Sequence, residues 1–184
     1  DPLAGTMQPQ PATIRDGRLH SHLRLQRRQC VILAVDPTGV AQATLPVPPI
    51  PGETLLELSA PWQAFTAQGE TINLPCPGDW AQVAGWETFA GTLHFRSEFV
   101  LDEQHSEQPL FLDLGEVGDI AEVLLNGQRV GVCAWAPYVL RIDPQCQAGR
   151  NQLEVRVTNS IANFYEGVQA RSGLLGMVRI RATA

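Results

Sequence analysis

The chain has 184 residues, of which 44% are hydrophobic and 17% charged, enough apolar material for one globular domain with a smaller attached segment. Its formal net charge is −6, and Arg27-Arg28 is its only basic pair, so it lacks the surplus of cations that a nucleic acid partner requires. All 13 basic residues are arginine, which excludes Schiff-base and phosphate-loop chemistry that depends on lysine.

The opening segment is predicted to end another domain. Its first residues show neither the cationic start nor the apolar core of a signal peptide. Residues 18–36 have the pattern of two strands with a tight turn near Gln26 to Arg28, and an isolated hairpin of this size is marginal in water. Prolines at 46, 48, 49 and 51 favour an extended linker. The domains expected are tail strands plus linker at 1–44 and the main domain at 45–184.

The main domain follows the two-residue alternation of half-buried β-strands. No segment keeps a helical period over three turns, and Asp79 to Trp86 makes at most a short turn. Strands are expected at 54–67, 89–101, 110–114, on both sides of Asn126-Gly127, and at 138–142, 153–157 and 178–180. The residues of the second strand expected to face the core are Leu93, Phe95, Phe99 and Leu101. Roughly eight short strands predict an all-β fold, a jelly-roll β-sandwich.

The hairpin around Asn126-Gly127 is the sharpest local prediction. These residues suit a type I′ turn, in which both central positions need a positive φ. Glu122 and Arg129 should then share the outer face. The cross-strand pairs expected are Leu125 with Gln128, Val123 with Val130, and Ala121 with Val132.

Residues that carry catalysis or bind metals in other proteins are present here without the required spacing. The cysteines Cys30, Cys76, Cys133 and Cys146 form no C-x-x-C pair; they permit disulfides, Cys133 with Cys146 for instance, but three full pairings are open. His20 and His22 share a strand face without a third ligand. Ser172 lies outside a nucleophile elbow, G-x-S-x-G. The strand glutamates Glu98, Glu122 and Glu154 alternate with core residues, as on solvated faces, so no catalytic residue is predicted.

Several segments together resemble a known family of β-sandwiches. They are GTLHFRSEFVL, PLFLDLGEVGDIAEVLLNGQRVG, WAPYVLRI, AGRNQLEVRVTN and SGLLGMVRI. Their order and spacing resemble the galactose-binding-like superfamily, as in the sugar-binding domains of glycoside hydrolase family 2. They resemble still more closely the C-terminal module of bacterial α-L-rhamnosidase-type glycoside hydrolases. The resemblance runs from Leu55 to about Ala182.

This resemblance implies a fold and a place in a larger enzyme, but no activity for this chain. In such enzymes the catalytic domain precedes the module, so the opening strands would complete that domain. We expect a non-catalytic accessory module whose partner is the catalytic domain of the same parent chain. A carbohydrate-binding module is the alternative, and a free-standing adhesin or interaction domain is a third class. Where relatives often carry Asn-Arg-Leu-Ile after the VTN strand, this chain has SIANFYEG, so no role is transferred to residues 161–167.

A sugar site needs an aromatic ring for the apolar face of a pyranose and amide or carboxylate groups for its hydroxyls. The residues predicted to bind carbohydrate are Trp135, Tyr138, Asn163, Tyr165 and Glu166. Trp80 and Trp86, near turns, are further candidates. The alternative is structural, because segment 135–138 would fold back over the sandwich and Trp62 and Trp86 would plug its ends.

No cofactor is expected, although a structural calcium ion is an open alternative. Asp113, Asp119 and Asp143 near strand ends could ligate calcium, as in some relatives, but no D-x-D-x-D loop is present. No apolar run approaches the roughly 20 residues that span a bilayer. The sequence leaves the compartment open, and the resemblance favours a periplasmic or secreted parent.

Overall fold

The computed structural model describes residues 10–23, 25, 31–35, 51–59, 61–74, 78–105 and 108–183. These residues form short antiparallel strands with very little helix. The strands are β1 (Thr13–Arg15), β2 (Arg18–His20), β3 (Pro51–Leu58), β4 (Gln63–Thr66), β5 (Thr71–Ile72), β6 (Thr92–Leu101), β7 (Leu110–Asp113), β8 (Ile120–Leu125), β9 (Gln128–Cys133), β10 (Val139–Arg141), β11 (Gly149–Thr158) and β12 (Val178–Thr183). The helix α1 is Ala162–Tyr165, and 3₁₀ turns lie at Trp80–Gln82 and Glu103–His105.

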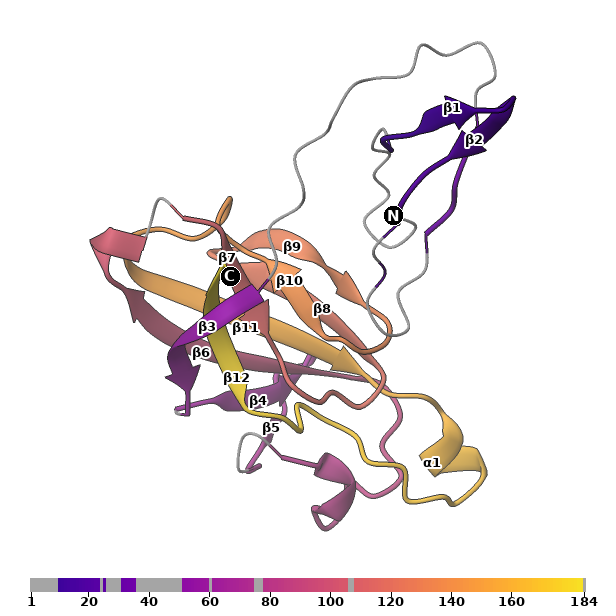
Figure 1. Ribbon diagram of the computed structural model, residues 1–184. Helices are drawn as coiled ribbons and strands as arrows, with labels where there is room; N and C mark the ends of the chain where they lie inside the picture. Colours follow the sequence, from indigo (N-terminus) through magenta and orange to yellow (C-terminus); the bar gives the residue numbers. More distant parts are fainter. Residues whose placement is uncertain are drawn as a thin grey trace.

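Strands β3 to β12 form two sheets that pack face to face (Figure 1). The smaller sheet has the order β10-β7-β12-β3 and the larger one β5-β4-β6-β11-β8-β9. In the central strand β11, Leu153, Val155 and Val157 are fully buried, while Glu154 and Arg156 alternate with them on the outer face. Buried residues of both sheets join in one core. The predicted all-β jelly-roll sandwich is confirmed, with ten strands in these described sheets in place of about eight.

Three tryptophan side chains lie in the hydrophobic core or pack against it. Trp80 is fully buried, with its ring centroid 6.0 Å from that of Phe89 and 6.3 Å from that of Phe95. It lies in the expected short turn, which the Asp79 carboxylate caps by accepting from the Ala81 N–H. The partly buried Trp62 and Trp86 also pack against the core. These three indole rings therefore have structural positions.

The β8–β9 hairpin has the predicted turn but a different register. Asn126 and Gly127 have φ of 53° and 76°, as a type I′ turn requires, and Leu125 lies opposite Gln128. Beyond this pair a β-bulge shifts the register, so that Val123 faces Gly131 and Ala121 faces Cys133. The predicted pairs Val123 with Val130 and Ala121 with Val132 are therefore wrong, because β9 carries one extra residue that an alternating pattern does not reveal.

The single strand expected over residues 54–67 is two strands in different sheets. β3 pairs with β12 in the smaller sheet, and β4 pairs with β6 in the larger one. The chain crosses between the sheets near Pro61, which has no N–H to donate to a ladder and whose carbonyl accepts from the Ser97 hydroxyl at 3.0 Å. The Trp62 indole donates to the Leu58 carbonyl at 3.1 Å and holds the bend.

The N-terminal hairpin is formed earlier in the chain than predicted. β1 and β2 pair around Asp16 and Gly17, whose φ values of 52° and 71° again suit a type I′ turn. The predicted turn near Gln26 to Arg28 lies outside the described residues, and the described residues 31–35 form no strand. The expected second strand is therefore wrong over this range.

The two glycines of the SGLLG motif lie very close to the backbone of neighbouring loops. A Cβ on Gly173 would collide with the carbonyl oxygen of Gly78, and one on Gly176 would collide with the backbone N of Glu116. The Gly176 N–H also donates to the Glu116 carbonyl at 2.8 Å. Only glycine lets the segment before β12 pass this close to the two neighbouring loops.

The described cysteines are free thiols. Cys133 is buried and Cys146 partly buried, and no disulfide joins them; Cys30 and Cys76 lie outside the described residues. Burial raises the pKa of both described thiols to about 11. They are therefore protonated at neutral pH and poor nucleophiles.

Candidate functional site

The predicted sugar-binding residues lie on loops that meet around Asp119. The Tyr138 hydroxyl donates to the Asp119 carbonyl at 2.7 Å, and the Asp119 carboxylate accepts from the Ser160 N–H at 2.6 Å. This joins the loops before β8, before β10 and after β11. Trp135 in the second loop is 36% exposed, whereas Tyr138 is buried.

The loop after β11 contains three of the residues predicted to bind sugar, one of them buried and two exposed. Asn163 is buried, and its amide exchanges two hydrogen bonds with the backbone of Ala170, each 2.9 Å long. Tyr165 is 73% exposed and meets Phe164 edge to face, with centroids 5.1 Å apart, and Glu166 is also exposed. The structure therefore presents Trp135, Tyr165 and Glu166 to solvent, while Tyr138 and Asn163 support the loops.

The three aspartates considered for calcium make separate protein contacts. Asp113 accepts from Arg181 at 3.1 Å, and Asp143 accepts from Arg141 at 2.7 Å. Burial raises the pKa of Asp143, but hydrogen bonds from Arg141 and the Leu110 N–H outweigh it and leave the pKa below its usual value. Among the described residues, no three His, Cys, Asp or Glu side chains come together as a metal site would require.

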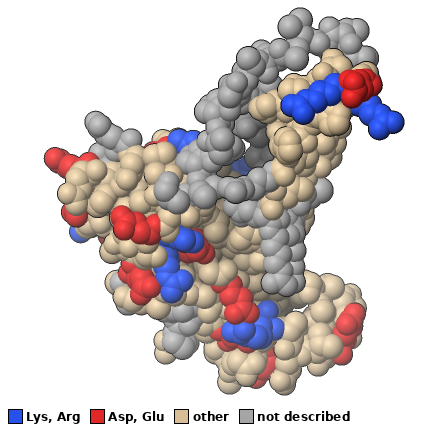
Figure 2. Space-filling model, in the orientation of Figure 1, with Lys and Arg blue, Asp and Glu red and all other residues tan. Residues whose placement is uncertain are grey.

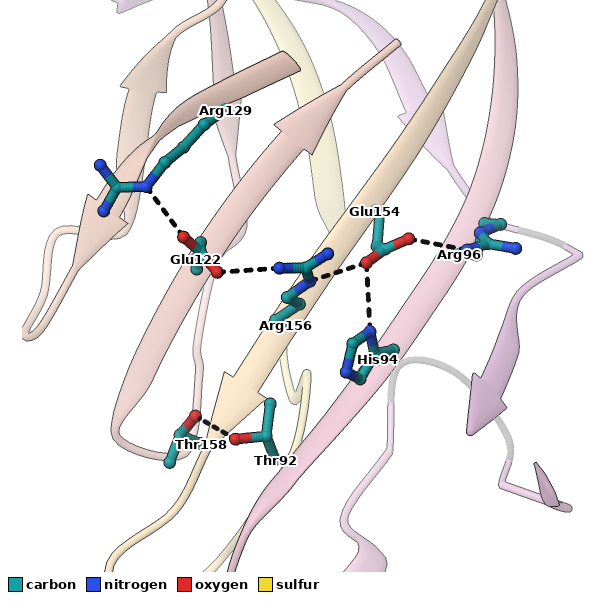
Figure 3. Close-up of polar contacts among 8 residues, drawn as sticks. All are labelled: Thr92, His94, Arg96, Glu122, Arg129, Glu154, Arg156 and Thr158. Atoms are coloured by element: carbon teal, nitrogen blue, oxygen red, sulfur yellow. Dashed lines mark hydrogen bonds and ion pairs between the residues drawn. The ribbon is translucent and has the colours of Figure 1, made fainter. Parts of the chain in front are cut away.

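The outer face of the six-stranded sheet carries a ladder of alternating charge that spans four strands (Figure 3). Glu122 accepts from Arg129 at 2.8 Å and from Arg156 at 3.3 Å. Arg156 also donates to Glu154 at 2.8 Å, and Glu154 accepts from Arg96 at 2.8 Å. The predicted shared outer face of Glu122 and Arg129 is confirmed. Figure 2 shows similar mixing on one face of the molecule, where arginine and acidic side chains lie next to one another.

Glu154 is the centre of this ladder. Besides the two arginines, it is bonded to His94 Nδ1 at 3.1 Å, and only 14% of its side chain is exposed. Burial raises the pKa of Glu154, but the hydrogen bonds from Arg96, Arg156 and His94 outweigh it and hold the pKa at about 2. The carboxylate is thus fully ionised at neutral pH and accepts a hydrogen bond on both oxygens.

A shallow depression of about 460 Å³ lies beside the ladder. It is formed by β6, β8, β9, β11 and the turn after β4. Its lining residues are Ala67, Thr92, His94, Ile120, Glu122, Val132, Arg156 and Thr158. The hydroxyls of Thr92 and Thr158, on neighbouring strands, hydrogen-bond to each other at 2.7 Å (Figure 3). Hydroxyl, imidazole, guanidinium and aliphatic groups therefore share one concave surface.

Sequence reasoning found the outward direction of these side chains but not their convergence. Arg156 lies directly opposite Glu122 on one side and His94 on the other. Alternation gives the face of each residue, whereas the meeting of three strands depends on registers that the sequence leaves open. The signal that could have found the cluster was the succession of outward polar residues on β6, β8 and β11.

The proteins to which this chain is similar are much longer than the chain itself. No family model matches the chain. Over 77 residues it is 42% identical to a Formosa agariphila protein named "Putative beta-glucuronidase", a stretch that covers 41% of this chain and 7% of that protein. The rhamnosidase from Novosphingobium sp. PP1Y is similar in structure, with a TM-score of 0.63 and 31% identity over 76% of this chain and 16% of that enzyme.

The sandwich also recurs in more distant structures. The Ruminococcus gnavus β-glucuronidase has a TM-score of 0.61 and 18% identity over 74% of this chain and 30% of that one. At that identity the similarity concerns the fold alone. The chain spans less than a third of the length of each of these proteins. The chain is therefore similar to a part of rhamnosidase- and β-glucuronidase-type glycoside hydrolases, and it has the predicted all-β sandwich fold.

Proposed function

We propose that this chain is a non-catalytic accessory β-sandwich module of a bacterial glycoside hydrolase, which packs on and stabilises a catalytic domain outside this chain. The observation that carries the proposal is where large apolar side chains are exposed. Apart from Val100, Ile120 and Trp135, the exposed large apolar side chains of the described residues lie in two segments of the chain. The first comprises Ile14, Leu19, Leu23, Leu25, Ile32, Leu33 and Val35, and the second comprises Ile161, Phe164, Tyr165 and Val168.

The two segments support docking in different ways. In the N-terminal hairpin Ile14 pairs directly with Leu19, at exposures of 72% and 53%, so this pair has the composition of a core without the neighbours that would cover it. On and around α1, the edge-to-face ring pair of Phe164 and Tyr165 and the side chain of Ile161, 56% exposed, form an exposed apolar surface. Such surfaces are typical of interfaces between proteins or domains.

The carboxylates argue against chemistry by this chain. Glycoside hydrolysis generally needs one carboxyl group with a raised pKa as the general acid and a second as nucleophile or base. The most enclosed glutamate of the ladder, Glu154, has its pKa lowered to about 2 instead. Glu98, Glu116 and Glu122 are each paired with arginine. These carboxylates have the environment of structural ion pairs.

Carbohydrate binding through the loop aromatics is the second candidate. It is favoured by the exposure of Trp135 and Tyr165 on loops that both connect to Asp119. An exposed aromatic ring can cover the apolar face of a sugar. The edge-to-face arrangement of Tyr165 with Phe164 forms a ridge and not a flat platform, and for this reason domain docking ranks first.

Two measurements test the leading proposal. The 184-residue chain should hydrolyse neither aryl α-L-rhamnoside nor aryl β-D-glucuronide above the buffer rate. When co-expressed with the remainder of its parent polypeptide, it should co-purify with the catalytic region. Phe164→Asp should weaken this association, whereas Val100→Asp, at an equally exposed apolar position on β6, should not. Turnover abolished by changing a single acid, or association unaffected by Phe164→Asp, would refute the proposal.

A further inference from the structure

The depression on the outer face of the six-stranded sheet offers both hydrogen-bond donors and hydrogen-bond acceptors. Thr92 and Thr158 share one hydrogen bond, so the hydroxyl that accepts it keeps its own proton for a third group. Arg156 donates through Nε and Nη1 to the two glutamates, and its Nη2 makes no hydrogen bond with the described residues. Two donors are therefore left for a ligand.

His94 contributes a further hydrogen-bonding atom, Nε2. Glu154 is ionised, so its oxygen can only accept, and the 3.1 Å contact places the proton on His94 Nδ1. In the neutral imidazole the lone pair then lies on Nε2, which Figure 3 shows on the side of the ring away from Glu154. The ring is held in this orientation by stacking on Phe65, with centroids 5.3 Å apart. The Nε2 atom is therefore held in place before any ligand arrives.

The charge of the lining favours a neutral ligand. Glu122 and Arg156 are the charged residues of the depression, and they are paired with each other at 3.3 Å. The neighbouring cations Arg96 and Arg129 are also paired with glutamates. An anionic ligand would have to compete with these carboxylates for the same guanidinium groups. A hydroxyl group, which donates and accepts at once, matches the surface without displacing a pair.

The remaining lining is aliphatic. Ile120 is 41% exposed, and with Val132 and Ala67 it forms the aliphatic part of the lining. A pyranose has the matching character, with C–H groups on one face and hydroxyls around its rim. We propose that this depression, whose lining includes neither Trp135 nor Tyr165, is a binding site for a neutral sugar residue. The site goes beyond the docking function and does not depend on it.

The test is an NMR titration of the isotopically labelled 184-residue chain at pH 7. The probes are methyl α-L-rhamnoside, methyl β-D-galactoside and methyl β-D-glucoside, with sodium D-glucuronate as the anionic comparison. At least one neutral glycoside should give saturable shifts of the Ile120, Val132 and Thr158 amides, with a dissociation constant on the order of 1 mM. Thr158→Val, which removes one hydroxyl at constant shape, should weaken binding about fivefold.

Two further variants make the result interpretable. Thr183→Val makes the same change on β12 in the other sheet and should leave the affinity unchanged. Ile120→Glu is at an exposed position, so the fold should survive, and it should abolish binding; it decides the matter if Thr158→Val does not fold. The proposal is overturned if no neutral glycoside gives saturable shifts up to about 50 mM, well above the expected constant. Shifts confined to residues 134–138 and 161–167, or binding of glucuronate alone, would overturn it equally.

Discussion

The side chains of Asn126 and Asn151 hydrogen-bond to each other at 2.9 Å and join the β8–β9 turn to strand β11. Asn126 also donates to the Gln145 carbonyl and accepts from the Gln152 N–H, each at 2.9 Å. Asn151 is fully buried and accepts a second bond from the Gln147 N–H at 3.0 Å. One asparagine thus supplies the positive φ of the turn and satisfies buried polar groups of two neighbouring segments.

We expect Asn126→Gly to separate these two roles. Glycine accepts a positive φ, so the turn persists, but the amide contacts to Gln145, Asn151 and Gln152 are lost. Urea unfolding should show a loss of about 1–3 kcal/mol, the cost of leaving buried polar groups without partners. Asn126→Asp is the matched control, because aspartate also tolerates a positive φ and keeps an acceptor for the Gln152 N–H, but it loses the two amide donor bonds. A loss in Asn126→Gly no larger than in Gly127→Asn would contradict a role for the amide contacts.

Gly127→Val should destabilise the chain for a different reason. Nothing lies within 4 Å of a Cβ at this position, but the φ of 76° is strained for a β-branched residue. The expected loss is roughly 1–3 kcal/mol in the urea midpoint analysis. Gly127→Asn, which tolerates a positive φ, should lose much less. Two variants of equal stability would contradict the strain argument.

Gly176→Ala tests close approach without a special φ. The added Cβ would collide with the backbone of Glu116 and lie 2.8 Å from the Gly115 Cα, so the loop before β8 has to move. We expect a loss of about 2 kcal/mol or more in thermal or urea unfolding. Gly131→Ala is the control, because its Cβ would meet only the end of the Leu140 side chain, at 3.2 Å. A cost at Gly131 as large as that at Gly176 would show that backbone collision is not the cause.

The limits of sequence prediction follow from the range of each interaction. Alternation correctly gave the faces of β6 and β11, because the period of two is a property of a single strand. The bulge beyond Val123 and the bend at Pro61 were missed, since each depends on what the neighbouring strand or sheet offers. The Tyr138 hydroxyl donates to the Asp119 carbonyl, a contact between residues 19 positions apart that the alternation pattern does not reveal.

Lowering the pH should remove the stability that Glu154 contributes. Its folded pKa of about 2 lies below the ordinary value of 4.5, so this contribution is complete above about pH 4.5 and is lost as the pH falls towards 2. The amount is on the order of 2–3 kcal/mol. Urea unfolding at several pH values should therefore show a slope over this window that is reduced in Glu154→Gln. An unchanged slope would place the acid sensitivity elsewhere.

The boundary between the N-terminal segment and the sandwich can be tested by truncation. None of the described residues between 10 and 35 is buried, whereas Pro51 at the start of β3 lies opposite Thr183 at the end of β12. A chain that begins at residue 45 keeps all ten strands of the sandwich and should unfold cooperatively, with the β-sheet circular dichroism of the full chain. A chain that begins at residue 59 is the control, because it also lacks β3 and with it the only described partner of one edge of β12. It should lose cooperative unfolding, since the buried Val178 and Ile180 would border an open sheet edge. If the first truncation behaves like the second, the opening residues belong to the sandwich and residues 1–44 are not the end of another domain.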